Sequence, residues 1–106
     1  MTPFADILKN LPVIDDIASI TLYSGDSDTP VDIIENKPGK AGSVAVYNAL
    51  LQEFGTLNAD AANKGLELYA EHVADAKANP GKHPNIDRLF EIIEQQSEMR
   101  MEINEK

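Results

Sequence analysis

The stretch Asn36-Lys37-Pro38-Gly39-Lys40-Ala41-Gly42-Ser43 separates a segment with strand character from a segment with helical character. Pro38-Gly39 fits a type II turn, which needs a positive φ that glycine adopts without strain. Gly42 gives the backbone conformational freedom just before Ser43, and serine is a residue type that caps helix N-termini. The stretch therefore predicts a strand-to-helix connector and divides the chain into a β part and an α part.

Residues on the N-terminal side of the connector predict a short helix and a β-hairpin. Thr2 followed by Pro3 is typical of a helix start, and apolar residues then recur at helical spacing. Residues 17–23 alternate apolar and polar side chains with a period of two, and residues 31–35 resume strand character after the turn-rich residues 24–30. We therefore expect a two-stranded antiparallel hairpin with a loop of about six residues.

Three helices are expected after the connector. Their predicted N-caps are Ser43, Asn58 and Asn85, and the second helix is expected to run to about residue 79. The first of the three has an unusually wide apolar face, which favours a buried position. Polar residues interrupt the apolar stripe of the third helix near its end. Residues 97–106 are therefore expected to fray or to mediate oligomerisation.

The order of these elements predicts an α+β fold in a single domain over residues 1–106. A short N-terminal helix and a two-stranded antiparallel β-hairpin are followed by three α-helices packed on the hairpin. A mostly helical bundle with the hairpin as an appendage is the alternative. A length of 106 residues is typical of one domain with one hydrophobic core.

The charge balance bears on the partners that can be expected. Lys and Arg number 9 against 18 Asp and Glu, which gives a formal net charge of -9. Such a charge repels nucleic acids and anionic membranes, so neither is expected as a partner. The absence of cysteine excludes disulfide bonds and thiolate chemistry. No segment has the pattern of a secretory signal or of a spanning helix, so a cytoplasmic location is expected.

Positive charge in this acidic chain gathers at two glycine-containing turns. The first is the connector, and the second is a shorter turn of similar sequence, Pro80-Gly81-Lys82-His83-Pro84. The order Gly-x-x-x-x-Gly-Lys-Ser/Thr of a phosphate-binding loop is absent. Backbone amides at a helix start, the helix dipole and the lysines still favour a small anionic ligand or an acidic protein partner. A purely structural turn is the alternative. The candidate ligand-binding residues are Lys37, Gly39, Lys40, Gly42, Ser43, Lys82 and His83.

No catalytic residue, metal ligand or cofactor site can be assigned from the pattern. His72 and Asp75 have the spacing of two metal ligands on one helix face, but no second His or Cys cluster completes a coordination sphere. His72 shares its face with apolar residues and is expected to be structural. Asp26, Asp28 and Asp32 are spaced like the first ligands of a calcium loop, but the required central glycine is absent.

Two runs of sequence carry a resemblance to a known family. These runs are Ile34-Glu35-Asn36-Lys37-Pro38-Gly39 through Ser43-Val44-Ala45-Val46-Tyr47, and Asn79-Pro80-Gly81-Lys82-His83-Pro84-Asn85-Ile86-Asp87. They resemble a family of small, single-domain proteobacterial proteins catalogued as a domain of unknown function, and the likeness covers nearly the whole chain. The resemblance implies a bacterial cytosolic protein and implies nothing about its chemistry.

The residues favour a noncatalytic interaction or small-ligand-binding module that uses the surface around residues 36–43. The alternative is a small enzyme in which Lys40, Ser43 or His83 handles a phosphorylated or carboxylated small molecule. Convergence of these residues on one concave pocket would distinguish a small-molecule site from a flat interaction surface.

Self-association is also expected. A two-stranded hairpin is marginally stable in water and both of its strands are edges. Ile34 lies on the strand face opposite Val31 and Ile33, and the C-terminal tail keeps Met99, Met101 and Ile103 beyond the apolar stripe of the last helix. A homodimer that pairs hairpin edges or buries the tail would cover these side chains. The alternative is that Ile34 packs on the protein's own helices and the tail frays.

Overall fold

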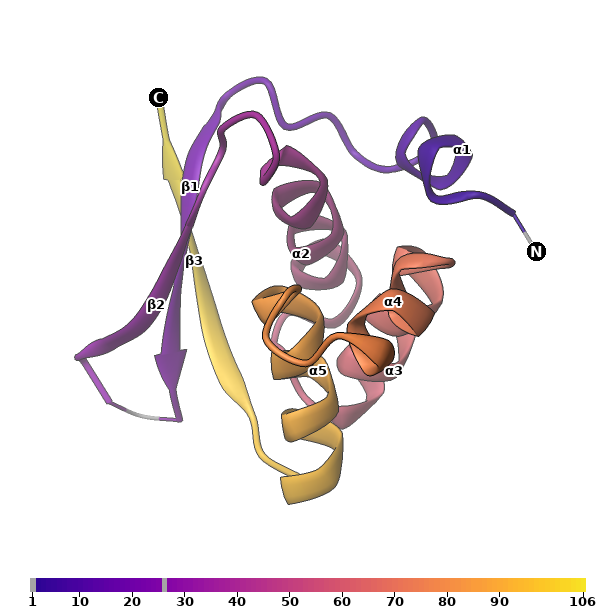
Figure 1. Ribbon diagram of the computed structural model, residues 1–106. Helices are drawn as coiled ribbons and strands as arrows, with labels where there is room; N and C mark the ends of the chain where they lie inside the picture. Colours follow the sequence, from indigo (N-terminus) through magenta and orange to yellow (C-terminus); the bar gives the residue numbers. More distant parts are fainter. Residues whose placement is uncertain (1, 26) are drawn as a thin grey trace.

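The computed structural model describes residues 2–25 and 27–106, so Asp26 of the calcium-like spacing lies outside the described residues. An antiparallel sheet stands on one side of the molecule and helices cover one of its faces (Figure 1). This arrangement confirms the α+β fold class. The elements are α1 (Phe4–Leu8), β1 (Ile17–Ser24), β2 (Pro30–Glu35), α2 (Ala41–Phe54), α3 (Ala59–Tyr69), α4 (His72–Ala78), α5 (Pro84–Gln95) and β3 (Met99–Glu105).

The sheet has the strand order β2-β1-β3, with both neighbours antiparallel to β1. Ile20 of β1 stands between Ile34 of β2 and Ile103 of β3. Ile20 and Ile34 are buried under the helices, whereas Val31 and Ile33 are 51% and 50% exposed on the other face. Ile34 therefore faces the core of its own chain, which is the alternative considered for this residue.

The sheet contains three strands where a two-stranded hairpin was expected. Residues 99–105 form β3 along β1 instead of a frayed helical tail. Gln96 ends α5 in the left-handed conformation with a φ of 52°, which turns the chain back towards the sheet. Met101 is then buried against the helices, while Arg100 and Glu102 are exposed. The alternation of apolar and polar residues in this segment follows the period of a strand.

Four helices follow the connector, because the expected second helix is divided in two. Asn58 caps α3 as predicted, since its side chain accepts a hydrogen bond of 2.9 Å from the Ala61 amide. Ala70 then adopts a φ of 52°, an uncommon conformation for a residue with a Cβ, and α4 starts at His72. The break changes the direction of the chain and brings α4 beside the turn that precedes α5 (Figure 1).

The connector turns as predicted, but the first helix starts earlier than predicted. Gly39 has a φ of 88°, and the Lys37 carbonyl accepts hydrogen bonds of 2.9 Å from the amides of both Lys40 and Ala41. The N-cap position of α2 is therefore Lys40. The expectation that Ser43 caps this helix is wrong, because Ser43 already lies within its first turn.

The prediction that Asn85 caps the last helix is also wrong. His83 occupies the N-cap position and Pro84 is the first helical residue of α5. The side chain of Asn85 has another partner, since its Oδ1 accepts a hydrogen bond of 2.8 Å from Arg88. Arg88 also forms an ion pair with Asp32 of β2 and so connects α5 to the sheet.

The core lies between the sheet and the helices. Its largest fully buried side chains include those of Tyr47, Leu50 and Leu89. Gly65 lets α3 approach closely, because a Cβ added there would lie 2.8 Å from Leu89 Cδ1 and 3.0 Å from Leu50 Cδ1. Burial of a large apolar side chain such as that of Leu50 or Leu89 contributes about 1.5–3 kcal/mol to stability. Within the described ranges no helix is both long and apolar enough for a membrane span.

Candidate functional site

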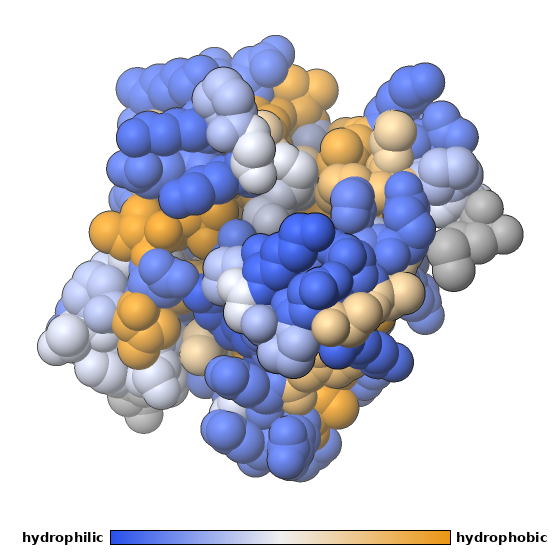
Figure 2. All heavy atoms as spheres, viewed as in Figure 1, coloured by the Kyte–Doolittle hydropathy of each residue, from blue (hydrophilic) through white to orange (hydrophobic). Residues whose placement is uncertain are grey.

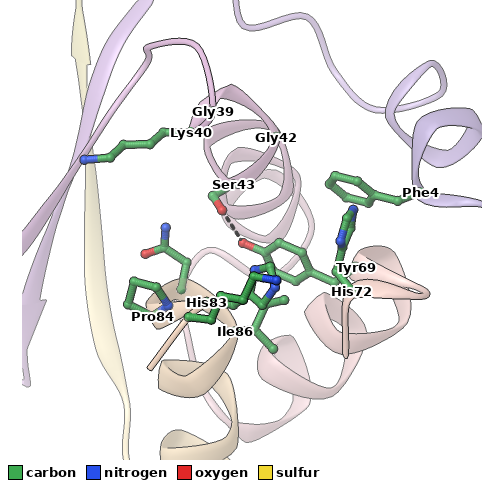
Figure 3. A pocket seen from close by; sticks show the side chains of 12 residues that line it. Phe4, Gly39, Lys40, Gly42, Ser43, Tyr69, His72, His83, Pro84 and Ile86 are labelled. Carbon is green, nitrogen blue, oxygen red and sulfur yellow. Dashed lines mark hydrogen bonds between the residues drawn. The ribbon is translucent and has the colours of Figure 1, made fainter. Parts of the chain in front are cut away.

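A pocket of about 320 Å³ lies where the connector, the α3–α4 junction and the turn before α5 meet (Figure 3). These segments are far apart in the sequence, and the packing of α2, α3 and α5 brings them together. The lining residues are Phe4, Gly39, Lys40, Gly42, Ser43, Tyr69, His72, Lys82, His83, Pro84, Asn85 and Ile86.

The pocket gathers most of the candidate ligand-binding residues. Gly39, Lys40, Gly42, Ser43, Lys82 and His83 all line it. The connector and the second basic turn, residues 80–84, therefore lie on two sides of one cavity. Lys37 lies outside the lining, and its Nζ forms an ion pair of 3.0 Å with Glu35 Oε2. The hydrogen bond from Lys37 and its charge lower the pKa of the Glu35 carboxyl.

The start of α2 presents two free amides to the pocket. The Ala41 amide donates to the Lys37 carbonyl, and the Val44 amide donates to the Lys40 carbonyl at 3.1 Å. The amides of Gly42 and Ser43, which lie between them, have no hydrogen-bond acceptor within residues 2–25 and 27–106. Unpaired amides of a helix N-terminus carry partial positive charge, so this wall favours an anion.

The start of α5 contributes to the opposite wall in the same way. The amides of Ile86 and Asp87 both donate to the His83 carbonyl, at 3.0 and 2.9 Å, and Pro84 has no N–H. The Asn85 amide is left without an acceptor in the described part of the chain. The residue is held in place by the Tyr47 hydroxyl, which donates a hydrogen bond of 2.6 Å to the Asn85 carbonyl.

Asp75 of α4 binds the two basic residues of the second turn. His83 Nε2 lies 2.5 Å from Asp75 Oδ2, and Lys82 Nζ lies 3.2 Å from the same oxygen. Asn79 Nδ2 donates to the other carboxylate oxygen at 3.0 Å. The hydrogen bonds from His83 and then Lys82 lower the pKa of the Asp75 carboxyl. Asp75 is therefore ionised near neutral pH and fixes the orientation of the His83 ring.

Aromatic rings form the remaining wall. The ring of Phe4 stacks on Tyr69 with a centroid distance of 5.7 Å and meets the His72 ring edge-on at 4.9 Å. The centroid of His72 lies 5.9 Å from that of His83. The Phe4 amide donates a hydrogen bond of 2.8 Å to Glu71 Oε1, which anchors α1 at the pocket. Phe4, Tyr69 and His72 were not among the candidate ligand-binding residues, because tertiary packing alone brings them to the site.

Lys40 and Ser43 line the pocket from the start of α2. Ser43 Oγ accepts a hydrogen bond of 2.7 Å from the Tyr69 hydroxyl (Figure 3). The side chain of Lys40 extends away from Ser43 towards the sheet, and its Nζ forms no ion pair with any described residue. Its unpaired ammonium group is therefore available to a ligand after rotation about the side-chain bonds.

The described residues include no group of three or more His, Cys, Asp or Glu side chains that could hold a metal ion. The pocket lining offers amide, ammonium, imidazole and hydroxyl groups. Such groups donate hydrogen bonds to phosphate or carboxylate oxygens.

Comparison with known proteins identifies the family. No curated protein and no protein of known structure matches the chain. A family model described as "Uncharacterized protein conserved in bacteria (DUF2322)" matches residues 4–103. This range contains both basic turns and every residue that lines the pocket. The chain therefore belongs to the DUF2322 family of bacterial proteins, which confirms the expected resemblance to a family of unknown function.

Proposed function

We propose that this protein is a noncatalytic binding module whose ligand is a small phosphorylated or carboxylated molecule held in the pocket between α2, α3 and α5. The observation that carries this proposal is the convergence of two helix N-termini on one cavity. Their free amides belong to Gly42, Ser43 and Asn85, and Lys82 stands beside them. A phosphate or carboxylate group accepts hydrogen bonds from just such donors.

The pocket gathers positively charged groups and hydrogen-bond donors in a chain that is acidic as a whole. The formal net charge is -9, so an anionic ligand needs a local source of positive charge. Each helix N-terminus supplies about half an elementary charge, and Lys40 and Lys82 add their ammonium groups. Asp75 offsets part of the charge of Lys82. After rotation of its side chain towards the pocket, Lys40 therefore supplies the larger share of unpaired side-chain charge.

The concave shape favours a small ligand over a protein partner. A volume of about 320 Å³ is at the lower end of small-molecule sites, which span roughly 300–1,000 Å³. The aromatic wall of Phe4 and His72 offers apolar surface next to the amides. The pocket therefore suits a molecule with one anionic end and a compact apolar or ring-containing part.

A small enzyme is the second candidate function, and the pair formed by Asp75 and His83 is the observation that favours it. A histidine oriented by a carboxylate is a common acid–base group in enzymes. The His83 ring borders the same cavity as the free amides, so a bound anionic substrate would lie beside it.

Phosphate titration followed by amide NMR tests the proposed binding site directly. We expect the largest chemical-shift changes at the amides of Gly42, Ser43 and Asn85. The Gly55 amide serves as an internal control, because it donates to the Leu51 carbonyl at the other end of α2. Changes at the three pocket amides no larger than those across the rest of the chain would contradict the proposal.

Two neighbouring lysines provide a matched pair of variants. Lys40 lines the pocket, whereas Lys37 is paired with Glu35 outside it. We expect Lys40→Ala to weaken phosphate binding about fivefold, the effect of losing roughly 1 kcal/mol of interaction between exposed charges. Lys37→Ala removes the same formal charge and should weaken binding by less than about twofold. Equal effects of both variants would indicate a general charge effect without a site.

A further inference from the structure

We propose that His83 is a phosphoryl acceptor, and that its Nδ1 takes a phosphoryl group from a reactive donor of the acyl phosphate or phosphoramidate class. This inference rests on the proposed anion site and adds a covalent step to it. His83 and the groups that would hold the transferred phosphoryl line one pocket, and Asp75, which orients the His83 ring, contacts it from α4.

The hydrogen bond to Asp75 selects Nδ1 as the reactive nitrogen. His83 Nε2 lies 2.5 Å from Asp75 Oδ2, and a carboxylate can only accept, so Nε2 carries the proton. Nδ1 of the neutral ring then carries the lone pair. His83 stands at the N-cap position of α5, but its side chain makes no capping hydrogen bond. Nδ1 has no protein partner among residues 2–25 and 27–106, and the His83 side chain is 25% exposed.

The surroundings of His83 suit a phosphorylated ring. A phosphoryl group on the N-cap residue brings oxygen acceptors to the start of α5, where the Asn85 amide is free. The amides of Gly42 and Ser43 line the same cavity, and Lys82 is the adjacent residue. A phosphorylated side chain carries a charge of about -1.5 to -2 near pH 7, which these donors stabilise.

The transfer is a nucleophilic displacement at phosphorus that changes no oxidation state. The Nδ1 lone pair attacks phosphorus and forms the N–P bond. The bond between phosphorus and the leaving group of the donor breaks, and the leaving group keeps the electron pair, as a carboxylate from an acyl phosphate or as ammonia from phosphoramidate. The Nε2 proton stays on the ring, and the ionised Asp75 carboxylate compensates the positive charge that develops there.

His72 provides an internal control in the same pocket. Its ring centroid lies 5.9 Å from that of His83, so both histidines meet the same dissolved reagent. The His72 ring packs edge-on against Phe4 and forms no hydrogen bond with a carboxylate in the described part of the chain. The proposal therefore requires selective modification of one of two neighbouring histidines.

Incubation of the folded protein with potassium phosphoramidate, followed by intact-mass and peptide-mapping mass spectrometry, tests this selectivity. We expect one acid-labile phosphoryl group on His83, added at least about tenfold faster than on His72, because a charge-assisted hydrogen bond orients only the His83 ring. Unfolding the protein in urea should abolish the preference. Equal rates for the two histidines in the folded protein, or faster reaction at His72, would overturn the proposal.

Two matched carboxylate variants test the positioning role of Asp75. Asp75→Asn should slow modification of His83 about tenfold through loss of the ionised hydrogen-bond acceptor. Asp60→Asn removes the same charge from the first turn of α3, outside the pocket lining, and should leave the rate unchanged. Circular dichroism verifies that both variants fold. An unchanged rate in Asp75→Asn would overturn the assignment of Nδ1 as the reacting atom.

The phosphate titration separates failure of this inference from failure of the proposed binding site. A protein that shows phosphate-induced shifts at Gly42 and Ser43 but no preference for His83 retains the anion site and is not a phosphoryl acceptor. A protein that shows neither result has neither property. Protection of His83 from phosphoramidate by added inorganic phosphate would support both proposals together.

Discussion

The hydroxyl group of Tyr69 donates a hydrogen bond of 2.7 Å to Oγ of Ser43 and so joins the end of α3 to the first turn of α2. The Tyr69 side chain is nearly fully buried, and both residues line the pocket. The Ser43 hydroxyl therefore bonds to Tyr69 and does not cap the helix. This bond fixes the wall that carries the free amides of α2.

The first prediction concerns the loss of this bond. Tyr69→Phe should lower the free energy of unfolding by about 1 kcal/mol, the usual contribution of one intramolecular hydrogen bond. Urea denaturation monitored by circular dichroism measures the change. Tyr23→Phe removes a hydroxyl from the outer face of the sheet and serves as the control. Equal losses in the two variants would show that the bond between α3 and α2 adds nothing to stability.

The second prediction concerns the contact between α3 and α5. Gly65→Ala places a methyl group at a buried position of α3, 2.8 Å from the fully buried Leu89 Cδ1. Overpacking of this kind costs about 1–3 kcal/mol, whereas alanine adds up to about 1 kcal/mol of helix propensity. We expect a net loss of stability in a urea titration. In the Leu89→Ala background the same substitution should be neutral or stabilising, since the clash is then removed.

The third prediction concerns alkaline pH. Burial, opposed in part by the charge of Arg88, raises the pKa of Tyr47 from 10.0 to about 12. The unfolded chain therefore loses this proton first, so the stabilisation is fully present below pH 10 and is lost as the pH rises towards 12. The free energy of unfolding should fall over this window by up to about 1.4 kcal/mol per pH unit for this group.

Burial also raises the pKa of Tyr69, so its contribution has the same sign. Stability measured at intervals between neutral pH and pH 12 checks the prediction. Tyr47→Phe removes the ionisable hydroxyl and should make the alkaline fall shallower. An alkaline profile as steep in Tyr47→Phe as in the parent protein would contradict it.

The fourth prediction concerns the contact between α1 and the pocket. Gly42→Ala places a Cβ 3.1 Å from Phe4 Cε2, so the Phe4 ring must shift. We expect little change in stability, because Phe4 is only partly buried, and at least about twofold weaker phosphate binding by NMR titration, because the methyl group crowds the pocket next to the Gly42 amide. In the Phe4→Ala background the substitution should have a smaller effect, and full additivity would contradict the proposed contact.

The fifth prediction concerns self-association. Ile34 and Met101, two of the residues that motivated it, are buried within their own chain, so the expectation now depends on the outer face of the sheet. Val31 and Ile33 are exposed on β2, an edge strand, and Figure 2 shows apolar patches among the hydrophilic surface on the side of the sheet. Pairing of two β2 edges would bring these side chains into contact across the strands and cover part of their surface.

We expect the average mass from light scattering to rise with protein concentration. Ile33→Lys should return the protein to the monomer, because a charge on the outer face opposes edge pairing. Val13→Lys changes an exposed apolar residue outside the sheet and is the control. A strictly monomeric mass of the parent protein at high micromolar concentration would exclude this association.

The sequence carried enough information to predict the hairpin and the core helices, but the third strand was missed. Met99, Met101 and Ile103 recur with a period of two, which is the strand signal, yet the segment follows a helix without a glycine or proline to mark the boundary. The left-handed conformation of Gln96 supplies that boundary. The break at Ala70 likewise has no local signal, because alanine favours a continuous helix.

The two basic turns of the pocket could be found from sequence because glycine, proline and lysine mark them locally. Their convergence could not be found, because it depends on how α2, α3 and α5 pack. The aromatic wall was missed for the same reason, since Phe4 and Tyr69 lie in segments with ordinary helical patterns. Lys37 was included on charge alone, and its ion pair with Glu35 could not be foreseen.

The central position of β1 has a consequence for the order in which the chain folds. β1 and β2 are neighbours in sequence and can pair early, whereas pairing with β3 closes a loop that contains α2, α3, α4 and α5. Closing so long a loop is entropically costly and slows folding. During synthesis one edge of β1 remains open until residues 99–105 have left the ribosome. A nascent chain halted before that point exposes this edge to other chains.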